Sequence, residues 1–151
     1  MTIGDYIKGY VIDNYNFDIY QIDICLTKKN ILDVINFHSI GSQIRFVNGK
    51  PYKIICEAYL KEGYTYFPST LTKGNKPDIL GSIIVTGIDE YGDSVPLTDD
   101  DIKTIEEFVS LRTYNKNGIL QSIYTLEVDN PTGTNIQTNE QSEIPNLRRA
   151  L

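Results

Sequence analysis

The chain has 151 residues, of which 40% are hydrophobic and 23% are charged, and its formal net charge is −6. These values are typical of a globular protein long enough for one domain with its own core, and they exclude an intrinsically disordered chain. No apolar run approaches the roughly 18 residues of a membrane-spanning helix, and the opening residues lack the basic and apolar regions of a signal peptide, so we expect a cytoplasmic protein or a particle assembled there.

The first residues place apolar side chains at helical spacing. In a helix, one face would carry Ile3, Tyr6, Ile7, Tyr10 and Val11. This spacing predicts a short amphipathic helix over residues 2–14, peripheral to the domain. Gly4 and Gly9 would each weaken that helix by about 1 kcal/mol relative to alanine. The helix is therefore expected to pack against its own domain or against a neighbouring molecule.

Between Tyr20 and Leu26 the period changes to two, which predicts a half-buried strand. Thr27 is then expected to cap a short helix whose apolar face lies within residues 31–35. The dipeptide Asn48-Gly49 stands between two apolar runs. Because both residues tolerate the positive φ of a tight turn, it predicts a β-hairpin.

The second half of the chain predicts the same kinds of element. Residues 79–88 indicate a buried strand, Thr98 a capped helix and Asn117-Gly118 a second hairpin. One face of the last strand is expected to carry Leu120, Tyr124, Leu126 and Val128. The predicted core residues are Ile22, Ile24, Ile83, Ile84, Phe108, Leu126 and Val128. This pattern predicts one globular α+β domain over residues 1–128, mainly antiparallel sheet with two or three short helices.

Residues 61–78 read as a long connection rich in Gly, Pro, Thr and Lys, and they include three aromatic residues, Tyr64, Tyr66 and Phe67. A loop of this length in a compact domain is usually functional or held by a partner. Aromatic side chains dominate the energetics of protein interfaces. We therefore predict that these three side chains lie at an intermolecular contact.

After Asp129 the composition becomes polar, and residues 130–143 have too few apolar side chains to offset the entropy of ordering them. The last stretch regains apolar anchors and positive charge in Ile144, Leu147, Arg148, Arg149 and Leu151. We predict that residues 129–151 form an extended polar C-terminal arm that docks on a neighbouring subunit. The two arginines would pair with carboxylates of residues 89–107 in the next copy.

Charge is distributed unevenly along the chain. Residues 89–107 hold eight acidic residues against Lys103 alone, a net charge of −7, whereas residues 45–80 carry a net charge of +3. These segments are either two solvated surfaces without a partner or complementary patches that meet head to tail, the geometry that closes into rings. Within the acidic segment Asp99, Asp100 and Asp101 suit the first turn of a helix, and a divalent-cation site is the second interpretation. The same three carboxylates are candidate interface residues.

The sequence offers no motif for catalysis. His38 is the only histidine and stands beside no recognisable nucleophile, and there is no phosphate-binding loop or dinucleotide fingerprint, so we expect no enzymatic activity and no cofactor. Cys25 and Cys56 are interpreted as reduced thiols, because two cysteines and one histidine supply too few ligands for a structural zinc site. The isoelectric point of about 4.7 disfavours direct binding of nucleic acid.

Three features carry a resemblance to a known group of proteins: the opening Thr2-Ile3-Gly4-Asp5-Tyr6-Ile7-Lys8, the compact β-rich middle, and the polar arm that reaches Leu147-Arg148-Arg149. Together they resemble small virion proteins of tailed bacteriophages, especially the neck or ring proteins between portal and tail. The resemblance implies a structural role, in which copies of the protein form a ring that joins other structural proteins of the same particle. The alternative is a small cytosolic acidic protein, of inhibitor or immunity type, that presents residues 89–107 to a basic target. A large defined oligomer favours the first hypothesis, and a monomer favours the second.

Overall fold

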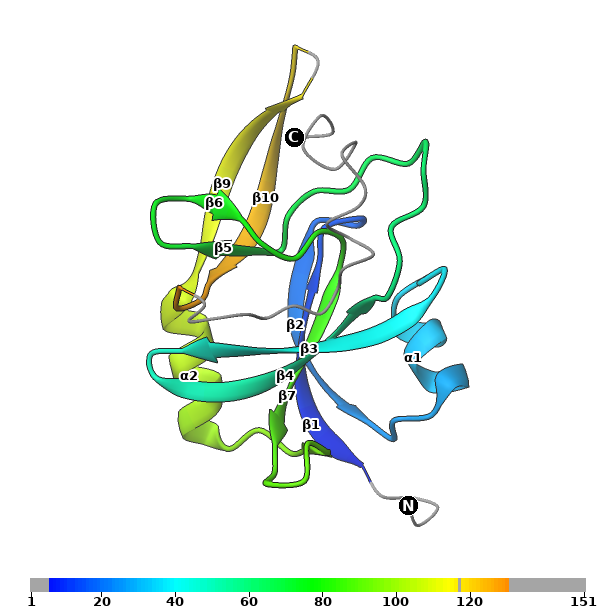
Figure 1. The fold of residues 1–151 in the computed structure, drawn as a ribbon, viewed down its shortest axis with the longest axis vertical. Helices are drawn as coiled ribbons and strands as arrows, with labels where there is room; N and C mark the ends of the chain where they lie inside the picture. The colour runs from blue at the N-terminus through cyan, green and yellow to red at the C-terminus, as the bar shows by residue number, and fades with distance from the viewer. Residues whose placement is uncertain (1–5, 117, 131–151) are drawn as a thin grey trace.

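The computed structural model describes residues 6–116 and 118–130. The start of the predicted helix and most of the predicted C-terminal arm, including Ile144, Leu147, Arg148, Arg149 and Leu151, lie outside the described residues. The described residues form two β-sheets and two helices (Figure 1). This arrangement confirms an α+β fold dominated by antiparallel sheet.

The larger sheet forms the centre of the domain. Its strands follow the order β2-β1-β7-β4-β3, with β8 paired to β7, and all of these pairings are antiparallel. They are β1 (Ile7–Asp13), β2 (Asp18–Ile24), β3 (Ile40–Val47), β4 (Lys50–Glu57), β7 (Ile83–Ile88) and β8 (Ser94–Val95).

The smaller sheet has the order β6-β5-β10-β9. Its strands are β5 (Thr70–Thr72), β6 (Lys76–Pro77), β9 (Val109–Lys116) and β10 (Ile119–Glu127). The pairing of β10 with β5 is parallel, and the other two are antiparallel. The helices are α1 (Lys28–Val34) and α2 (Asp99–Phe108).

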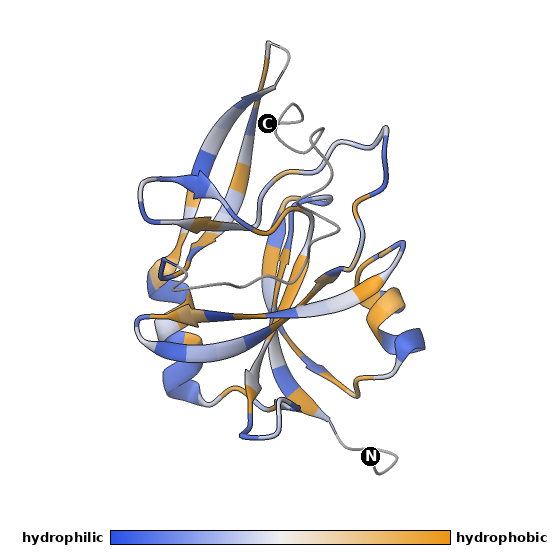
Figure 2. Cartoon of the chain, viewed as in Figure 1, coloured by the Kyte–Doolittle hydropathy of each residue, from blue (hydrophilic) through white to orange (hydrophobic). Residues whose placement is uncertain are grey.

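Two apolar cores cover the two faces of the larger sheet. On one face Ile12 of β1 belongs to a core that includes Ile105 of α2 and Leu126 of β10. On the other face Val11 belongs to a core that includes Ile31 of α1. Hydrophobic residues accordingly concentrate on the central strands of the larger sheet (Figure 2). The larger sheet is therefore covered on both sides, by α1 on one and by α2 with the smaller sheet on the other.

The predicted helix starts and the hairpin turn at Asn48-Gly49 are confirmed, and β9 pairs with β10 as the second predicted hairpin requires. The Thr27 side chain accepts a hydrogen bond from the amide of Asn30 at 3.1 Å, and Thr98 accepts one from the amide of Asp101 at the same distance. Asn48 and Gly49 have φ values of 52° and 84°, as a tight hairpin turn requires. These elements were predictable because their signals lie within a few adjacent residues.

The helix predicted over residues 2–14 is wrong within the described residues, where Ile7–Asp13 form strand β1. Tyr10, Val11 and Ile12 are all buried, because β1 lies between β2 and β7 and both of its faces are covered. A strand buried on both faces shows a continuous apolar run, which a helical period can match by chance.

Five of the seven predicted core residues are fully buried. The other two, Ile22 and Phe108, are partly buried against the edges of the cores. Leu120 shares a face of β10 with Leu126, as predicted, but Leu120 is 68% exposed, so only the inner part of that face is buried. The loop predicted over 61–78 is shorter, since β5 and β6 occupy its second half.

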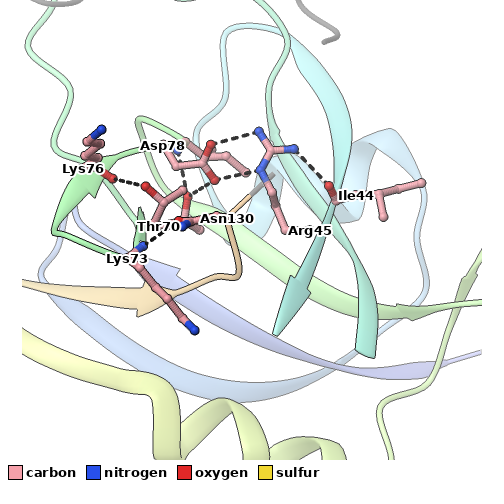
Figure 3. Close-up of polar contacts among 9 residues, drawn as sticks. Ile44, Arg45, Thr70, Lys73, Lys76, Asp78 and Asn130 are labelled. Atoms are coloured by element: carbon pink, nitrogen blue, oxygen red, sulfur yellow. Dashed lines mark hydrogen bonds and ion pairs between the residues drawn. The ribbon is translucent and has the colours of Figure 1, made fainter. Parts of the chain in front are cut away.

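A half-buried ion pair joins the two sheets at the edge strand β3 (Figure 3). The Arg45 guanidinium donates to both carboxylate oxygens of Asp78, at 2.7 and 3.0 Å, and the Thr70 hydroxyl donates to the same carboxylate at 2.9 Å. The Lys73 amide donates to the side chain of Asn130 at 3.1 Å. The Lys73–Asn130 contact holds the last described residue against the β5–β6 turn.

Candidate functional site

A cavity of about 690 Å³ opens between the β1–β2 turn, the segment after α1 and the connection after β4. We call it the aromatic cavity. Its aromatic lining residues are Tyr15, Phe17, Phe37, His38, Tyr64, Tyr66 and Phe67. Its volume lies within the roughly 300–1,000 Å³ of ordinary ligand sites.

The cavity brings together the three aromatic residues that the sequence singled out. The Tyr64 ring meets the His38 ring edge to face, with centroids 4.8 Å apart, and lies 6.5 Å from the Tyr66 ring. Phe67 meets Phe17 edge to face at 6.0 Å. Their predicted place at an intermolecular contact stays a prediction, because the described structure holds one copy of the chain.

Two buried carboxylates stand at the inner side of the cavity. Asp13 is 4% exposed and accepts hydrogen bonds from the amides of Tyr15 and Asn16 and from the Ser82 hydroxyl. Glu57 is 5% exposed and accepts from the amides at positions 38 and 39. Among the described residues neither carboxylate forms an ion pair with Lys or Arg. Both charges are therefore held by neutral donors and make the cavity a negative environment.

Tyr66 shows how this environment acts on a phenol. Burial raises its pKa, the hydrogen bond from the Lys61 amide at 3.0 Å lowers it, and the charge of Glu57 raises it further. The net result is a raised pKa, so the phenol stays neutral at physiological pH. Tyr66 also lies against Gly81, whose φ of 93° is a left-handed backbone conformation that other residues rarely adopt.

Cys56 and His38 belong to residue types that often act in catalysis, and the described structure shows the surroundings of both. Burial raises the pKa of the Cys56 thiol to about 12, so this cysteine is not a thiolate at neutral pH. His38 contributes its backbone amide to Glu57 and its ring to Tyr64. Within residues 6–116 and 118–130, no three His, Cys, Asp or Glu side chains gather as metal ligands, and no helix is long and apolar enough to cross a membrane.

The three predicted interface carboxylates of α2 differ in position. The side chain of Asp99 is 94% exposed and lies 3.7 Å from Lys8, and Asp100 is also exposed. Asp101 is 3% exposed and accepts hydrogen bonds from Lys50 at 2.7 Å and from the Tyr52 hydroxyl at 2.8 Å. Asp101 therefore acts inside its own domain.

Part of the predicted charge separation is compensated within the molecule. Lys50 pairs with Asp101, and Lys53 donates to the carbonyl of Gly92 at 2.8 Å, so two cations of the basic segment contact the acidic segment of their own chain. The exposed acidic residues that remain around α2 and the β7–β8 turn are Glu90, Asp93, Asp99, Asp100, Glu106 and Glu107. A negative surface therefore persists at this end of the domain.

A second candidate surface is the β9–β10 hairpin, which the sequence did not mark as functional. Leu111, Ile119 and Leu120 are 59%, 68% and 68% exposed. The register pairs Leu111 with Tyr124 and Leu120 with Asn115, so both leucines lie on one face of the hairpin. The distal part of the hairpin extends beyond the other strands at one end of the long axis (Figure 1).

The aromatic cavity and the hairpin are two surfaces of the described residues whose chemistry departs from an ordinary solvated exterior. The cavity combines aromatic walls with negative charge, and the hairpin exposes aliphatic side chains on a projection. No protein-family model, curated protein sequence or solved structure matches this chain.

Proposed function

We propose that this protein is a structural subunit of a homo-oligomeric assembly, in which the β9–β10 hairpin of one copy packs on the acidic end of the next copy. The observation that carries this proposal is the exposure of Leu111, Ile119 and Leu120 on a projecting hairpin. Leu111 and Leu120 share one face of the hairpin and Ile119 lies on the other, so both faces of the projection offer aliphatic side chains to another protein.

The hairpin has little support from its own domain. Strand β5 pairs only with Leu126 and Glu127 of β10, so the distal part of β10 pairs with β9 alone. Two-stranded hairpins are marginally stable in water, and edge strands offer backbone groups to other chains. Among the described strands β9 is such an edge. Packing on a neighbour would stabilise the hairpin and cover its apolar face.

Charge favours a second copy as that neighbour. Residues 110–125 include Arg112 and Lys116 and no acidic residue, whereas the whole chain carries −6. The hairpin tip and the acidic β7–β8 turn lie at opposite ends of the long axis (Figure 1). A positive, apolar tip meeting a negative end is a heterologous, head-to-tail contact, and such contacts close into rings when the rotation allows.

We propose that this ring is part of the virion of a tailed bacteriophage and lies at the neck between head and tail. The resemblance of the chain to such proteins supports this finer assignment, together with the head-to-tail geometry. Other structural proteins of the same particle would be the further partners. Mass spectrometry of purified particles would test it, with the chain expected in a fixed stoichiometry of several copies per particle.

We predict that Leu120→Glu in combination with Leu111→Glu dissociates the assembly. Both changes put negative charge on the face that would meet an acidic neighbour, and both positions are exposed, so the fold should survive. Light scattering should then give a mass of 17.1 kDa, that of one chain. Ile44→Glu on β3, where Ile44 is 51% exposed, is the matched control and should leave the oligomer intact. An unchanged oligomer in the double variant would refute the hairpin contact.

The acidic binding protein remains the second candidate, and one observation favours it. Tyr91 is 81% exposed at the β7–β8 turn, between Glu90 and Asp93. An exposed aromatic side chain among carboxylates suits the recognition of a basic protein. A chain that stays monomeric at all concentrations would support this function over the assembly.

A further inference from the structure

We infer that the aromatic cavity is the receptor for residues 144–151 of this protein, with Leu147 inserted and the arginines lying over the aromatic rim. This inference concerns the occupant of the cavity and does not depend on the hairpin contact. It also moves the predicted docking site of the arm away from residues 89–107. The exposed side chains there are mostly charged and offer little to the apolar anchors.

The lining of the cavity selects for apolar and cationic groups. Among the residues that line it there is no Lys or Arg, whereas Asp13, Asp33 and Glu57 supply carboxylates. Aromatic walls accept aliphatic side chains, and aromatic faces attract guanidinium and ammonium groups. The cavity is therefore complementary to a short segment that joins aliphatic anchors to positive charge.

A cation already lies over the rim. The Lys61 ammonium is 5.0 Å from the centroid of the Tyr64 ring, within the distance at which a cation is attracted to an aromatic face. Tyr64 is 50% exposed, so part of its ring stays accessible to a further group. The planar guanidinium of arginine stacks on such rings better than lysine does.

Residues 144–151 match these requirements. They contain Ile144, Leu147 and Leu151 together with Arg148 and Arg149, and no acidic residue. Residues 131–143 are largely polar and suit a tether. The 17 residues from Asn130 to Leu147 can span up to about 56 Å at about 3.3 Å per residue, so the segment can reach a cavity on its own domain or on a neighbour.

The test is site-specific photo-crosslinking in the full-length protein. A Leu147→p-benzoylphenylalanine variant is irradiated, and the linked residues are identified by mass spectrometry. The inference predicts links to the aromatic cavity, at Tyr64, Tyr66 or their neighbours. Links concentrated on α2, or scattered over the surface, would overturn it. Mixing isotope-labelled and unlabelled chains shows whether the crosslinked Leu147 position belongs to the same copy as the cavity or to another copy. A link to the cavity from either copy supports the inference that residues 144–151 occupy it.

Matched variants make the result specific. Tyr64→Ala should reduce the yield of cavity links about tenfold, because it removes an aromatic face from the rim. Tyr59→Ala is the control, since Tyr59 is 57% exposed on the same connection but does not line the cavity. A synthetic peptide of residues 144–151 should compete for the cavity, and the peptide with Arg148→Gln and Arg149→Gln should compete about tenfold less well. Equal loss of links in both tyrosine variants, or equal competition by both peptides, contradicts the inference.

Discussion

Replacing Asp101 with alanine is expected to lower the free energy of unfolding by about 2 to 4 kcal/mol. The change removes the helix cap that Asp101 forms with the Thr98 amide at 2.9 Å. It also takes the acceptor from the hydroxyl of Tyr52, which is 1% exposed. A lost cap costs about 1 kcal/mol, and a buried polar group without a partner about 1 to 3 kcal/mol. The ion pair between Asp101 and the exposed Lys50 adds little to the expected loss of stability, because water screens it.

Urea unfolding at fixed protein concentration measures this effect, and Asp100→Ala is its control. Asp100 stands one position away on the same helix and is exposed. Its replacement should therefore change stability by a few tenths of a kcal/mol. Equal effects at positions 100 and 101 would show that Asp101 does not have the buried role described here.

The same carboxyl predicts a dependence on pH. Burial by itself raises the pKa of Asp101, but the hydrogen bonds from Lys50, Thr98 and Tyr52 outweigh it, and the net pKa is lowered. A folded-state pKa below the unfolded value of about 3.9 contributes stability that is present above pH 4 and is lost as the pH falls through the folded pKa. Acid titration of Asp101→Asn should therefore show a smaller loss of stability below pH 4 than the parent protein shows.

Leu126→Ala is expected to destabilise the domain by about 3 to 5 kcal/mol, because it opens a cavity where the smaller sheet meets the core of the larger one. Leu126 has no exposed surface, and its amide donates to the Ser69 carbonyl at 2.9 Å. Leu120→Ala is the control on the same strand, and because Leu120 is 68% exposed, its loss should cost the isolated domain less than about 0.5 kcal/mol. Similar costs at the two positions would mean that the register of β10 is misplaced.

The sequence predicted the elements whose signals are local. Asn48-Gly49 and Thr98 each act through neighbours a few residues away, and both behave as expected. Strand β1 was not predicted because it forms through pairing with β2 on one edge and with β7 on the other. No local pattern distinguishes such a fully buried strand from one turn or two of an apolar helix.

The candidate site was predictable only in part, for the same reason. Tyr64, Tyr66 and Phe67 stood out because aromatic residues are unusual in a polar connection. Asp13 and Glu57 join them through the pairing of distant strands, and no spacing in the sequence brings these segments together. Asp101 was interpreted as a carboxylate of a helix start and as a candidate interface residue. Its contacts with Lys50 and Tyr52 were missed because these residues of β4 lie about fifty positions earlier in the chain.

The solution mass of the full-length protein tests the proposed assembly most directly. Light scattering coupled to size-exclusion chromatography should give one species whose mass is a multiple of 17.1 kDa and corresponds to several copies. Added salt should shift it toward smaller species, because the head-to-tail contact joins opposite charges. A mass of 17.1 kDa at every concentration and salt level would contradict the proposal that this protein is an assembly subunit.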